Sequence, residues 1–472
     1  MAARRNKDKN RAEKWRAKAK AKSYENKLLR MQLKRVESSR AKWRQKFQAA
    51  KREARWKKVP GHPFPLGLMW LGAVMHICCN VSLRATAQVL QKVALLYGQQ
   101  IKVASASTIR NWSLRLGLYY LTERVAPGRY ALIADESISM GRERLLVILL
   151  VRVDEQSRIA PLEMSDARVL HVQSKASWGG ADISAIIQQK TAGLGVELAY
   201  AVADKGTNLN KSFRLSGIPK VDDCTHLVAN CTKKQYQNDQ TLNGFVKKMN
   251  ETRARWSLST HLLHMPPALR KKARFHQVLV VHKWAEAILR DWDKLPPPVK
   301  EELEYVPQNR ALVAELKQVH ELAEKFFAIF KPKGLSEYTE QLWAKTCKAD
   351  YADILKSDPG ENLKLKQFLT TIDQYIAQTR SRFPHAGQLI CCSDIIESMF
   401  GKYKNKGGVD MITDDALKIA AYPRPVTIED VQAALAEIHI KSIKEWKQKN
   451  TTVSMLALKR KMAQKKASKM AA

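Results

Sequence analysis

The sequence has no long run of apolar residues, no pair of cysteines spaced as Cys-x-x-Cys, and few acidic residues for its length. Its longest apolar stretch, PLGLMWLGAVMHICC, is too short to cross a bilayer as a helix. The basic N-terminus lacks the apolar segment and cleavage site of a secretion signal. The seven cysteines are an odd number, which argues against a disulfide framework and favours a reducing compartment. We therefore expect a soluble protein of the cytoplasm (the nucleoid in a bacterium) or of a nucleus, with no membrane contact and no small-molecule cofactor.

The scarcity of acids leaves a large positive charge. The chain has 82 Lys and Arg residues against 45 Asp and Glu, a net charge of +37 over 472 residues. This excess goes beyond what solubility requires and indicates a polyanionic partner, with nucleic acid favoured over an acidic membrane surface. The length indicates about two to four domains.

The two ends of the chain are basic. Residues 1–60 hold 23 Lys or Arg and five acids, with no Pro or Gly before Pro60, so this arm is expected to be helical when bound. Two seven-residue rows give a weak coiled-coil pattern, with Leu29, Val36 and Trp43 in one row and Leu33 and Phe47 in the other. A disordered basic tail is the alternative. We expect this arm and the lysines of 459–466 to contact phosphates without reading sequence.

Residues 61–127 contain two short helical patterns. The first runs from Leu83 to Tyr97 and stops at Gly98; the second is capped by Ser105 or Ser107 and continues to Gly117. These dimensions fit a helix-turn-helix, in which the early residues of the second helix reach base edges or phosphates. The corresponding residues here are Thr108, Arg110 and Asn111. A plain helical hairpin is the alternative.

From residue 128 the pattern changes to that of strands. Strands are expected at 129–138, 144–154, 157–165, 196–206 and 218–226, with helices at 182–195 and 208–217. The order β-β-β-α-β-α-β predicts an α/β core with a mixed five-stranded sheet in residues 128–240. Residues 241–384 read as an all-helical insertion, residues 385–428 as the last part of the core, and residues 429–472 as a basic helical tail.

Two aspartates close strands of this expected sheet. Asp135 ends the first strand and Asp204 ends the fourth. A right-handed crossover places those strands side by side, so both carboxylates emerge at the same edge, where α/β sheets bind ligands. Two close carboxylates repel unless a cation lies between them, and hard cations such as Mg²⁺ prefer oxygen ligands.

A third carboxylate comes from the stretch SDIIESMFGKYKNK. A helix over 394–404 places Glu397, Gly401 and Lys404 in one row beside an apolar stripe formed by Ile395, Ile396, Met399, Phe400 and Tyr403. Glu397 then borders the buried face, Gly401 leaves room for a phosphate backbone, and Lys402 and Lys404 can hold that phosphate. Ser393 is expected to cap the helix. For each acid taken alone, a solvated strand end or turn is the commoner explanation.

The combination resembles the DDE transposases, whose catalytic domain has the RNase H-like fold. The family binds two divalent metals through two Asp and one Glu, which Asp135, Asp204 and Glu397 match, and ADKG around Asp204 looks like the family's D-x-G. The Glu397-x6-Lys404 spacing is that of the Y-R-E-K signature of a large bacterial insertion-sequence group, although Ile390 and Ser393 occupy the Tyr and Arg positions.

Two further segments resemble the hAT-type transposases, which also carry a helical insertion between the second Asp and the Glu. DCTH, ending at His226, looks like their C/D-x-x-H signature, and Arg255-Trp256 resembles an Arg-Trp pair of that insertion. His226 would then position DNA or a nucleophile, and Trp256 would stack on an unstacked base. The alternatives are that Asp222 or Asp223 caps a helix with His226 a satisfied core residue, and that Trp256 is a buried helix residue. A zinc site made from the remaining candidates fits no standard spacing: Cys224, Cys231, Cys391 and Cys392 with His226.

The resemblance implies a transposase that uses two Mg²⁺ or Mn²⁺ ions to cleave double-stranded DNA at transposon ends. The freed 3′-OH is then transferred into target DNA. Asp135 would bridge the two ions, with Asp204 and Glu397 each holding one. Bringing two ends together implies a homodimer or higher oligomer. The rival interpretations are a structure-selective nuclease of the same fold and a domesticated, non-catalytic DNA-binding protein.

Overall fold

The computed structural model describes residues 22–23, 26, 30–44, 59–96, 104–138, 143–153, 161–257, 262–269, 274–358, 360–405 and 412–452. The chain divides into two compact units: Met1–Ser113 with Val426–Glu437, and Leu114–Pro425 with Ile438–Ala472. The boundary expected after residue 127 thus falls earlier, inside helix α4 (Ala106–Thr122). The helical stretch 241–384 belongs to the same unit as the sheet.

The first unit is helical. It contains α2 (Leu66–Ile77), α3 (Leu83–Leu96), the start of α4 and α18 (Ile428–Glu437). Helix α2 packs against α3 and α18, and the Trp70 indole donates a hydrogen bond to the Val426 carbonyl, 2.9 Å away. The first predicted helix is confirmed from Leu83 to Leu96, and its predicted stop at Gly98 lies outside the described residues. The predicted cap is also present, because the Thr108 amide donates to Ser105 Oγ at 3.2 Å.

The basic ends fall largely outside the described residues. Residues 30–44 of the N-terminal arm form a helix whose apolar side chains, Val36 and Trp43 included, are exposed. Leu29 and Phe47 of the heptad pattern lie outside the described residues, as do the lysines of 459–466.

Helix α4 does not stop at Gly117 as predicted. It continues to Thr122, and Gly117 lies where the helix backbone comes close to the backbone of Leu417. A Cβ at position 117 would lie 2.3 Å from the Leu417 carbonyl oxygen. The glycine was interpreted as a helix stop, whereas its role is to let two backbones meet.

Gly117→Ala is expected to lower the free energy of unfolding of the full chain by about 2–4 kcal/mol, because the added methyl meets a backbone carbonyl that cannot turn aside. Gly244→Ala is the matched control, in the second turn of helix α8 (Gln240–Trp256), where an added methyl would meet no atom of the described residues within 4 Å. It should raise stability by about 0.5–1 kcal/mol. Urea unfolding measures both, and equal effects would contradict the close approach.

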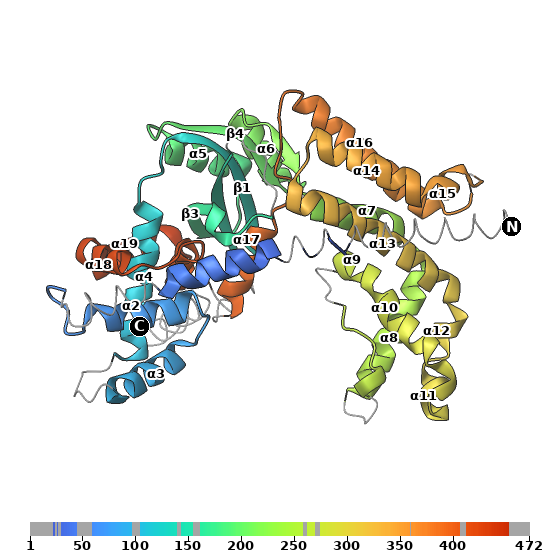
Figure 1. Ribbon diagram of the computed structural model, residues 1–472, viewed down its shortest axis with the longest axis horizontal. Helices are drawn as coiled ribbons and strands as arrows, with labels where there is room; N and C mark the ends of the chain where they lie inside the picture. The colour runs from blue at the N-terminus through green and yellow to red at the C-terminus, as the bar shows by residue number, and fades with distance from the viewer. Residues whose placement is uncertain are drawn as a thin grey trace, which may run out of the picture. The chain divides into compact units, whose positions relative to one another are not determined.

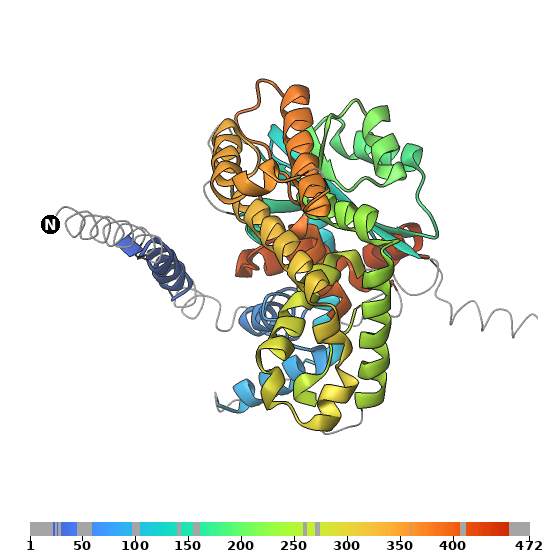
Figure 2. The same cartoon turned by 90° about the vertical axis from the view of Figure 1, so that its right-hand side faces the viewer.

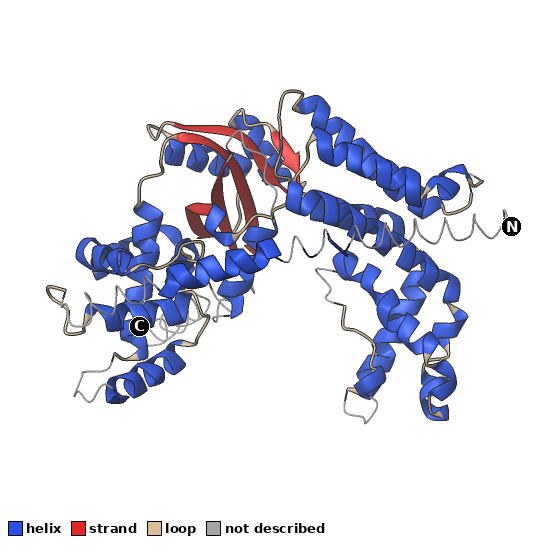
Figure 3. Ribbon diagram, viewed as in Figure 1, coloured by secondary structure: helices blue, strands red, loops and turns tan. Residues whose placement is uncertain are grey.

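The second unit is built on one mixed sheet (Figure 3). Its strands lie in the order β3-β2-β1-β4-β5. Strand β1 pairs antiparallel with β2 and parallel with β4, while β2–β3 is antiparallel and β4–β5 parallel. The expected α/β class with a five-stranded mixed sheet is confirmed. The strands are β1 (Gly128–Ile138), β2 (Arg144–Arg152), β3 (Ala167–Lys175), β4 (Val196–Ala203) and β5 (Lys220–Asp222).

Three strand predictions were wrong in detail. The third strand is 167–175, not 157–165; within the predicted segment the described residues 161–165 are a loop leading into a 3-10 turn. Its polar residues, such as His171 and Gln173, hid it because they break the apolar run expected of a buried strand. Strand β1 has nearly the expected span, but Asp135 lies three residues before its end and does not close it, and β5 is only three residues long.

The two faces of the sheet are covered differently. Helices α5 (Gly180–Thr191) and α6 (Thr207–Leu215) pack on the face that carries Leu132, Ala134 and Ala201 (Figure 1). Successive side chains of a strand alternate between faces, so Ile133, Asp135 and Val202 belong to the other face. On that face α17 (Asp394–Tyr403) packs against β1, and the 3-10 helix η7 (Asp414–Ala421) against β3.

The remaining described elements of this unit are helical. Helices α14 (Glu337–Asp350) and α16 (Leu363–Arg382) pack on the long α13 (Arg310–Lys333) (Figures 1 and 2). All regular elements in the described part of 241–384 are helices, as predicted. None of the described helices is long and apolar enough to span a bilayer. The helices are α7 (Cys224–Tyr236), α8, α9 (Arg274–Gln277), α10 (Val281–Arg290), α11 (Pro297–Glu302), α12 (Tyr305–Gln308), α13 (Arg310–Lys333), α14 (Glu337–Asp350), α15 (Ala352–Lys356), α16 (Leu363–Arg382) and α19 (Ile440–Asn450).

Candidate functional site

Asp135 lies on β1, and Asp204 directly follows the neighbouring parallel strand β4. The β1–β4 ladder ends with Ile133 opposite Val202; Asp135 is two residues further along β1, and Asp204 is one residue past the end of β4. An interval of two residues keeps a strand side chain on the same face, so Asp135 belongs to the face covered by α17. The Asp204 charge is close enough to raise the pKa of Asp135. The predicted juxtaposition is therefore what the sheet produces, although β1 runs on beyond Asp135.

The Asp204 carboxylate is held by its own turn. Gly206 N donates to Asp204 Oδ1 at 2.8 Å, and a Cβ on Gly206 would lie only 2.8 Å from that oxygen. Glycine two residues later is thus needed for the carboxylate to fold back over the turn. Lys220 at the start of β5 donates to the Asp204 carbonyl at 2.8 Å and pairs with Asp222 at 2.6 Å, which fixes the backbone of this strand end.

Helix α17 brings Glu397 to the same face. The five apolar residues of its predicted stripe are all buried, and the Ile390 amide donates to Tyr200 Oη at 2.8 Å, which anchors the preceding segment to β4. Glu397 is half exposed, as expected of a residue bordering the buried stripe. Ser393 occupies the N-cap position but makes no side-chain cap; its hydroxyl donates to Asp223 Oδ2 at 2.7 Å instead.

The charges of Asp204 and Glu397 act on Asp135. Burial is the largest of the effects that together raise the pKa of Asp135 to about 6; the charges of Asp204 and Glu397 also raise it, while the Glu136 amide and His226 lower it. Burial also raises the pKa of Glu397, while His226 lowers it. Among the described residues, the Asp135 carboxylate accepts one hydrogen bond, from Glu136 N at 2.7 Å. It is a partly buried, crowded anion with lone pairs to spare, which a cation would stabilise.

His226 faces this group and is held by Asp223. Asp223 caps α7 by accepting from the His226 amide at 2.7 Å, and the same oxygen lies 3.1 Å from His226 Nδ1. The hydrogen bond to Asp223 raises the pKa of His226 to about 9, so the ring is an imidazolium at neutral pH. Its Nε2 is 4.0 Å from Glu397 Oε1. The capping alternative is confirmed for Asp223, but His226 is a quarter exposed and no core residue.

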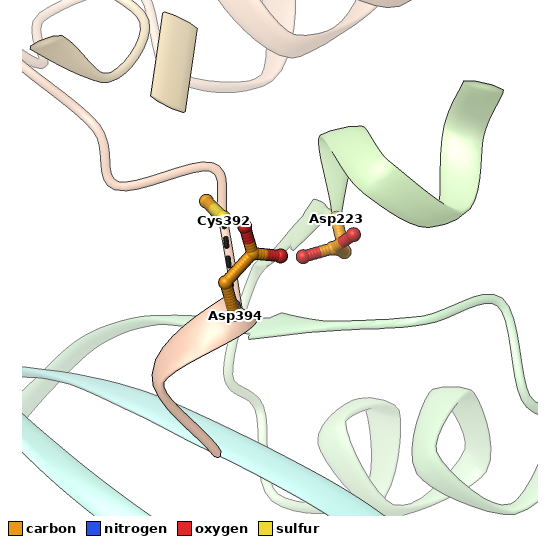
Figure 4. Close-up of side chains that lie close together, drawn as sticks. All are labelled: Asp223, Cys392 and Asp394. Atoms are coloured by element: carbon orange, nitrogen blue, oxygen red, sulfur yellow. Dashed lines mark hydrogen bonds between the residues drawn. The ribbon is translucent and has the colours of Figure 1, made fainter. Parts of the chain in front are cut away.

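A second cluster lies behind His226. Asp223, Cys392 and Asp394 form the one trio of possible metal ligands within the described chain whose ligand atoms all lie within 4.8 Å of one another (Figure 4). Asp223 already accepts four hydrogen bonds, two from His226 and two from Ser393. Asp394 accepts from Thr225 and from Lys331. The neighbouring Cys224 thiol and burial raise the pKa of Cys392, so the thiol is protonated and the trio is a poor metal site.

The ligand oxygens of Asp135, Asp204 and Glu397 do not all lie within 4.8 Å of one another. A pair of divalent ions about 3.5–4 Å apart takes its ligands from a wider group of carboxylates than a single ion does, with one carboxylate shared. Asp135 is the carboxylate whose pKa both others raise, which fits the central position. The donor set, all oxygen, suits Mg²⁺ or Mn²⁺.

The predicted helix-turn-helix contacts lie at the start of α4. Asn111 is exposed, and Thr108 and Arg110 are partly so. The Thr108 hydroxyl contacts Ser105 Oγ at 2.9 Å as part of the cap. Its side chain therefore has a role in starting the helix as well as a place on the surface.

Of the remaining residues predicted to contact DNA, one is buried and the others lie at the surface. Trp256 is 4% exposed, so the alternative of a buried helix residue is correct and a base cannot stack on it in this conformation. Arg255 beside it is exposed and pairs with Glu302 of α11. Lys402 and Lys404 are partly exposed, and their ammonium groups lie 6.0 Å from the Tyr422 and Phe400 rings.

Three residues of the site were missed from the sequence. Lys220, Lys331 and Asp394 each hold part of it, and all three form charged pairs or hydrogen bonds between different elements of the chain. No local spacing reveals such pairs. Comparison with known protein families and with characterised proteins gives no match for this chain, so the function is inferred from these residues and their geometry.

Proposed function

We propose that this chain is a DNA transposase of the DDE type, with an RNase H-like core. The observation that carries the proposal is that Asp135, Asp204 and Glu397, from three separate segments, come close enough that the charges of Asp204 and Glu397 add to the effect of burial, which is the main cause of the raised pKa of Asp135. The strand order, with three antiparallel strands followed by two parallel ones, supports the RNase H-like assignment. The net charge of +37 supports a nucleic-acid substrate.

The three carboxylates would hold two divalent ions, with Asp135 shared and Asp204 and Glu397 at either side. When bound, such ions activate a hydroxyl nucleophile and stabilise charge on the leaving oxygen of a phosphodiester. Asp204 is oriented for this by the Gly206 amide, and Glu397 by the packing of α17 on the sheet. The exposed half of Glu397 faces outward from the stripe, where a phosphate backbone can approach.

His226 would bind the substrate as a cation. Its imidazolium is oriented through Nδ1 by buried Asp223, which leaves Nε2–H directed toward the Glu397 side of the site. Nε2–H can donate to a nonbridging phosphate oxygen beside the carboxylates. Gly401 lies on the next turn of α17, and no atom of the described residues lies within 4 Å of its Cβ position, so the backbone of DNA could come close there.

The test is a strand-transfer assay with the full chain, Mg²⁺ or Mn²⁺, and labelled DNA ends taken from the sequences that flank the coding region. Glu397→Gln should reduce cleavage and joining by at least about 10³-fold, because one ligand for a divalent ion is lost. Glu197→Gln is the matched control, since Glu197 is an exposed residue of β4 paired with Arg129. Its activity should equal that of the unaltered chain.

Two results would reject parts of the proposal. Cleavage without joining of any DNA end would favour a structure-selective nuclease. Equal loss in the Glu397 and Glu197 variants, or none in either, would remove Glu397 from the reacting centre.

A further inference from the structure

The end of helix α13 is fastened to the segment that leads into α17. Leu335 and Leu389 form an antiparallel bridge with both amide-to-carbonyl distances at 2.8 Å. Gly334 makes this possible, since its φ is +64° and a Cβ there would lie 2.2 Å from the Leu389 oxygen. The Cys391 thiol also donates to the Phe330 carbonyl at 3.4 Å. The helical region therefore ends directly against the approach to Glu397.

One ion pair extends this junction into α17 itself. Lys331 Nζ donates to Asp394 Oδ2 at 2.6 Å, and the ammonium lies 4.3 Å from the centre of the Phe327 ring one turn earlier in α13. The other Asp394 oxygen accepts from Thr225 Oγ1 at 3.0 Å, at the start of α7. Asp394 is the first residue of α17 and Glu397 lies one turn later. The pair is partly buried, with the Lys331 side chain 28% exposed, so water screens it less than a surface pair.

We propose that Lys331 is a positioning residue for Glu397. Its ion pair with Asp394 fixes the first turn of α17, so that helix α13 determines the position of the Glu397 carboxylate. The inference rests on the proposed function for its link to divalent ions. The link between Lys331 and the α17 junction can be measured without it.

The structure supplies a matched control on the same helix. Lys325 lies on α13 and pairs with Asp350 of α14 at 2.9 Å, with an ammonium over the Tyr351 ring. Lys325→Met removes a comparable ion pair and ring contact but leaves α17 untouched. Lys331→Arg keeps the positive charge next to Asp394 and serves as the conservative variant.

The first measurement is the rate at which N-ethylmaleimide labels Cys391 and Cys392 in the full chain, followed by mass spectrometry. Both residues are buried, at 1% and 8% exposure, and immediately precede the pinned turn. Lys331→Met and Asp394→Asn should increase this rate by about tenfold, because the junction opens more often without the pair. Lys325→Met and Lys331→Arg should stay within about twofold of the unaltered chain.

The second measurement is the Mn²⁺ concentration that gives half-maximal DNA cleavage. It should rise about tenfold in Lys331→Met, while the rate at saturating Mn²⁺ falls less than about threefold, because a displaced Glu397 binds the ion more weakly. Unchanged labelling in both Lys331→Met and Asp394→Asn would overturn the proposal. So would faster labelling with an unaltered Mn²⁺ requirement. If the unaltered chain cleaves no DNA, the proposed function fails, yet the labelling rates still decide whether Lys331 fixes this turn.

Discussion

Asp135→Asn should abolish ion-dependent DNA cleavage and, at the same time, make the ion-free protein more stable. At neutral pH the Asp135 carboxylate is charged although its surroundings raise its pKa to about 6, through burial and the neighbouring Asp204 and Glu397. A pKa about two units above the ordinary value destabilises the fold by up to about 3 kcal/mol when the group is ionised. Asparagine removes this charge and retains an oxygen for the Glu136 amide.

The pH dependence gives the sign of this effect. A carboxyl whose folded pKa is raised costs stability above about pH 6, and the cost disappears as the pH falls below the unfolded value near 4. The stability gained by Asp135→Asn should therefore be largest at pH 7 and vanish near pH 4. Asp182→Asn is the control, because Asp182 is a half-exposed residue of α5 paired with Lys175.

Urea unfolding of the full chain with EDTA and with about 10 mM Mn²⁺ separates the cost of the Asp135 charge from the stabilisation by a bound ion. Mn²⁺ should stabilise the unaltered chain and the Asp182 variant, and should leave Asp135→Asn unchanged. A destabilised Asp135→Asn variant in EDTA would mean that the carboxylate has a structural partner and is not a crowded ligand.

Asp223→Asn should be the most damaging single change for stability and should also lower the pKa of His226. Asp223 is 1% exposed and joins α7 to α17 by accepting from two groups of His226 and two of Ser393. Burial raises its pKa, but these hydrogen bonds outweigh that effect and the net pKa is lowered. Asparagine places an amide NH₂ group, itself a donor, opposite groups that donate hydrogen bonds to the Asp223 oxygen. The free energy of unfolding should therefore fall by about 3–5 kcal/mol.

The effect on His226 is measured separately, by following its ring resonances against pH. Without the Asp223 charge, the pKa should fall from about 9 toward the ordinary range near 6.5. The raised pKa of His226 contributes to the free energy of unfolding fully below about pH 6.5, and this contribution is lost as the pH rises through 9. The variant lacks the contribution, so its stability should not show this decrease between pH 6.5 and 9. Asp222→Asn is the matched control, because the adjacent Asp222 pairs with Lys220 and should leave the pKa of His226 unaltered. An unaltered pKa in Asp223→Asn would contradict the assigned pairing.

The sheet and the three acids were accessible from the sequence because they depend on local patterns. Short apolar runs predicted four of the five strands, and the position of Asp204 after β4 followed from its strand. Glu397 was placed by helical spacing alone, since all five residues of the predicted stripe are buried. Polar residues hid β3, and Gly117 was misinterpreted because a helix stop and a close backbone approach require the same residue.

The supports of the site depend on tertiary contacts that no local pattern contains. Asp223 was a candidate helix cap, yet its second oxygen is engaged by Ser393 from the other end of the helical region. Lys331 was one lysine among many, and only the packing of α13 against the α17 junction distinguishes it. Trp256 is the opposite case: the Arg255-Trp256 motif suggested a DNA contact, but Trp256 is buried in the core.

The most direct test is the anomalous diffraction of crystals of the full chain grown with Mn²⁺. We expect two peaks about 3.5–4 Å apart, one touching Asp135 and Asp204 and the other Asp135 and Glu397. The absence of both peaks, or a peak at Asp223, Cys392 and Asp394 in their place, would contradict the two-ion site.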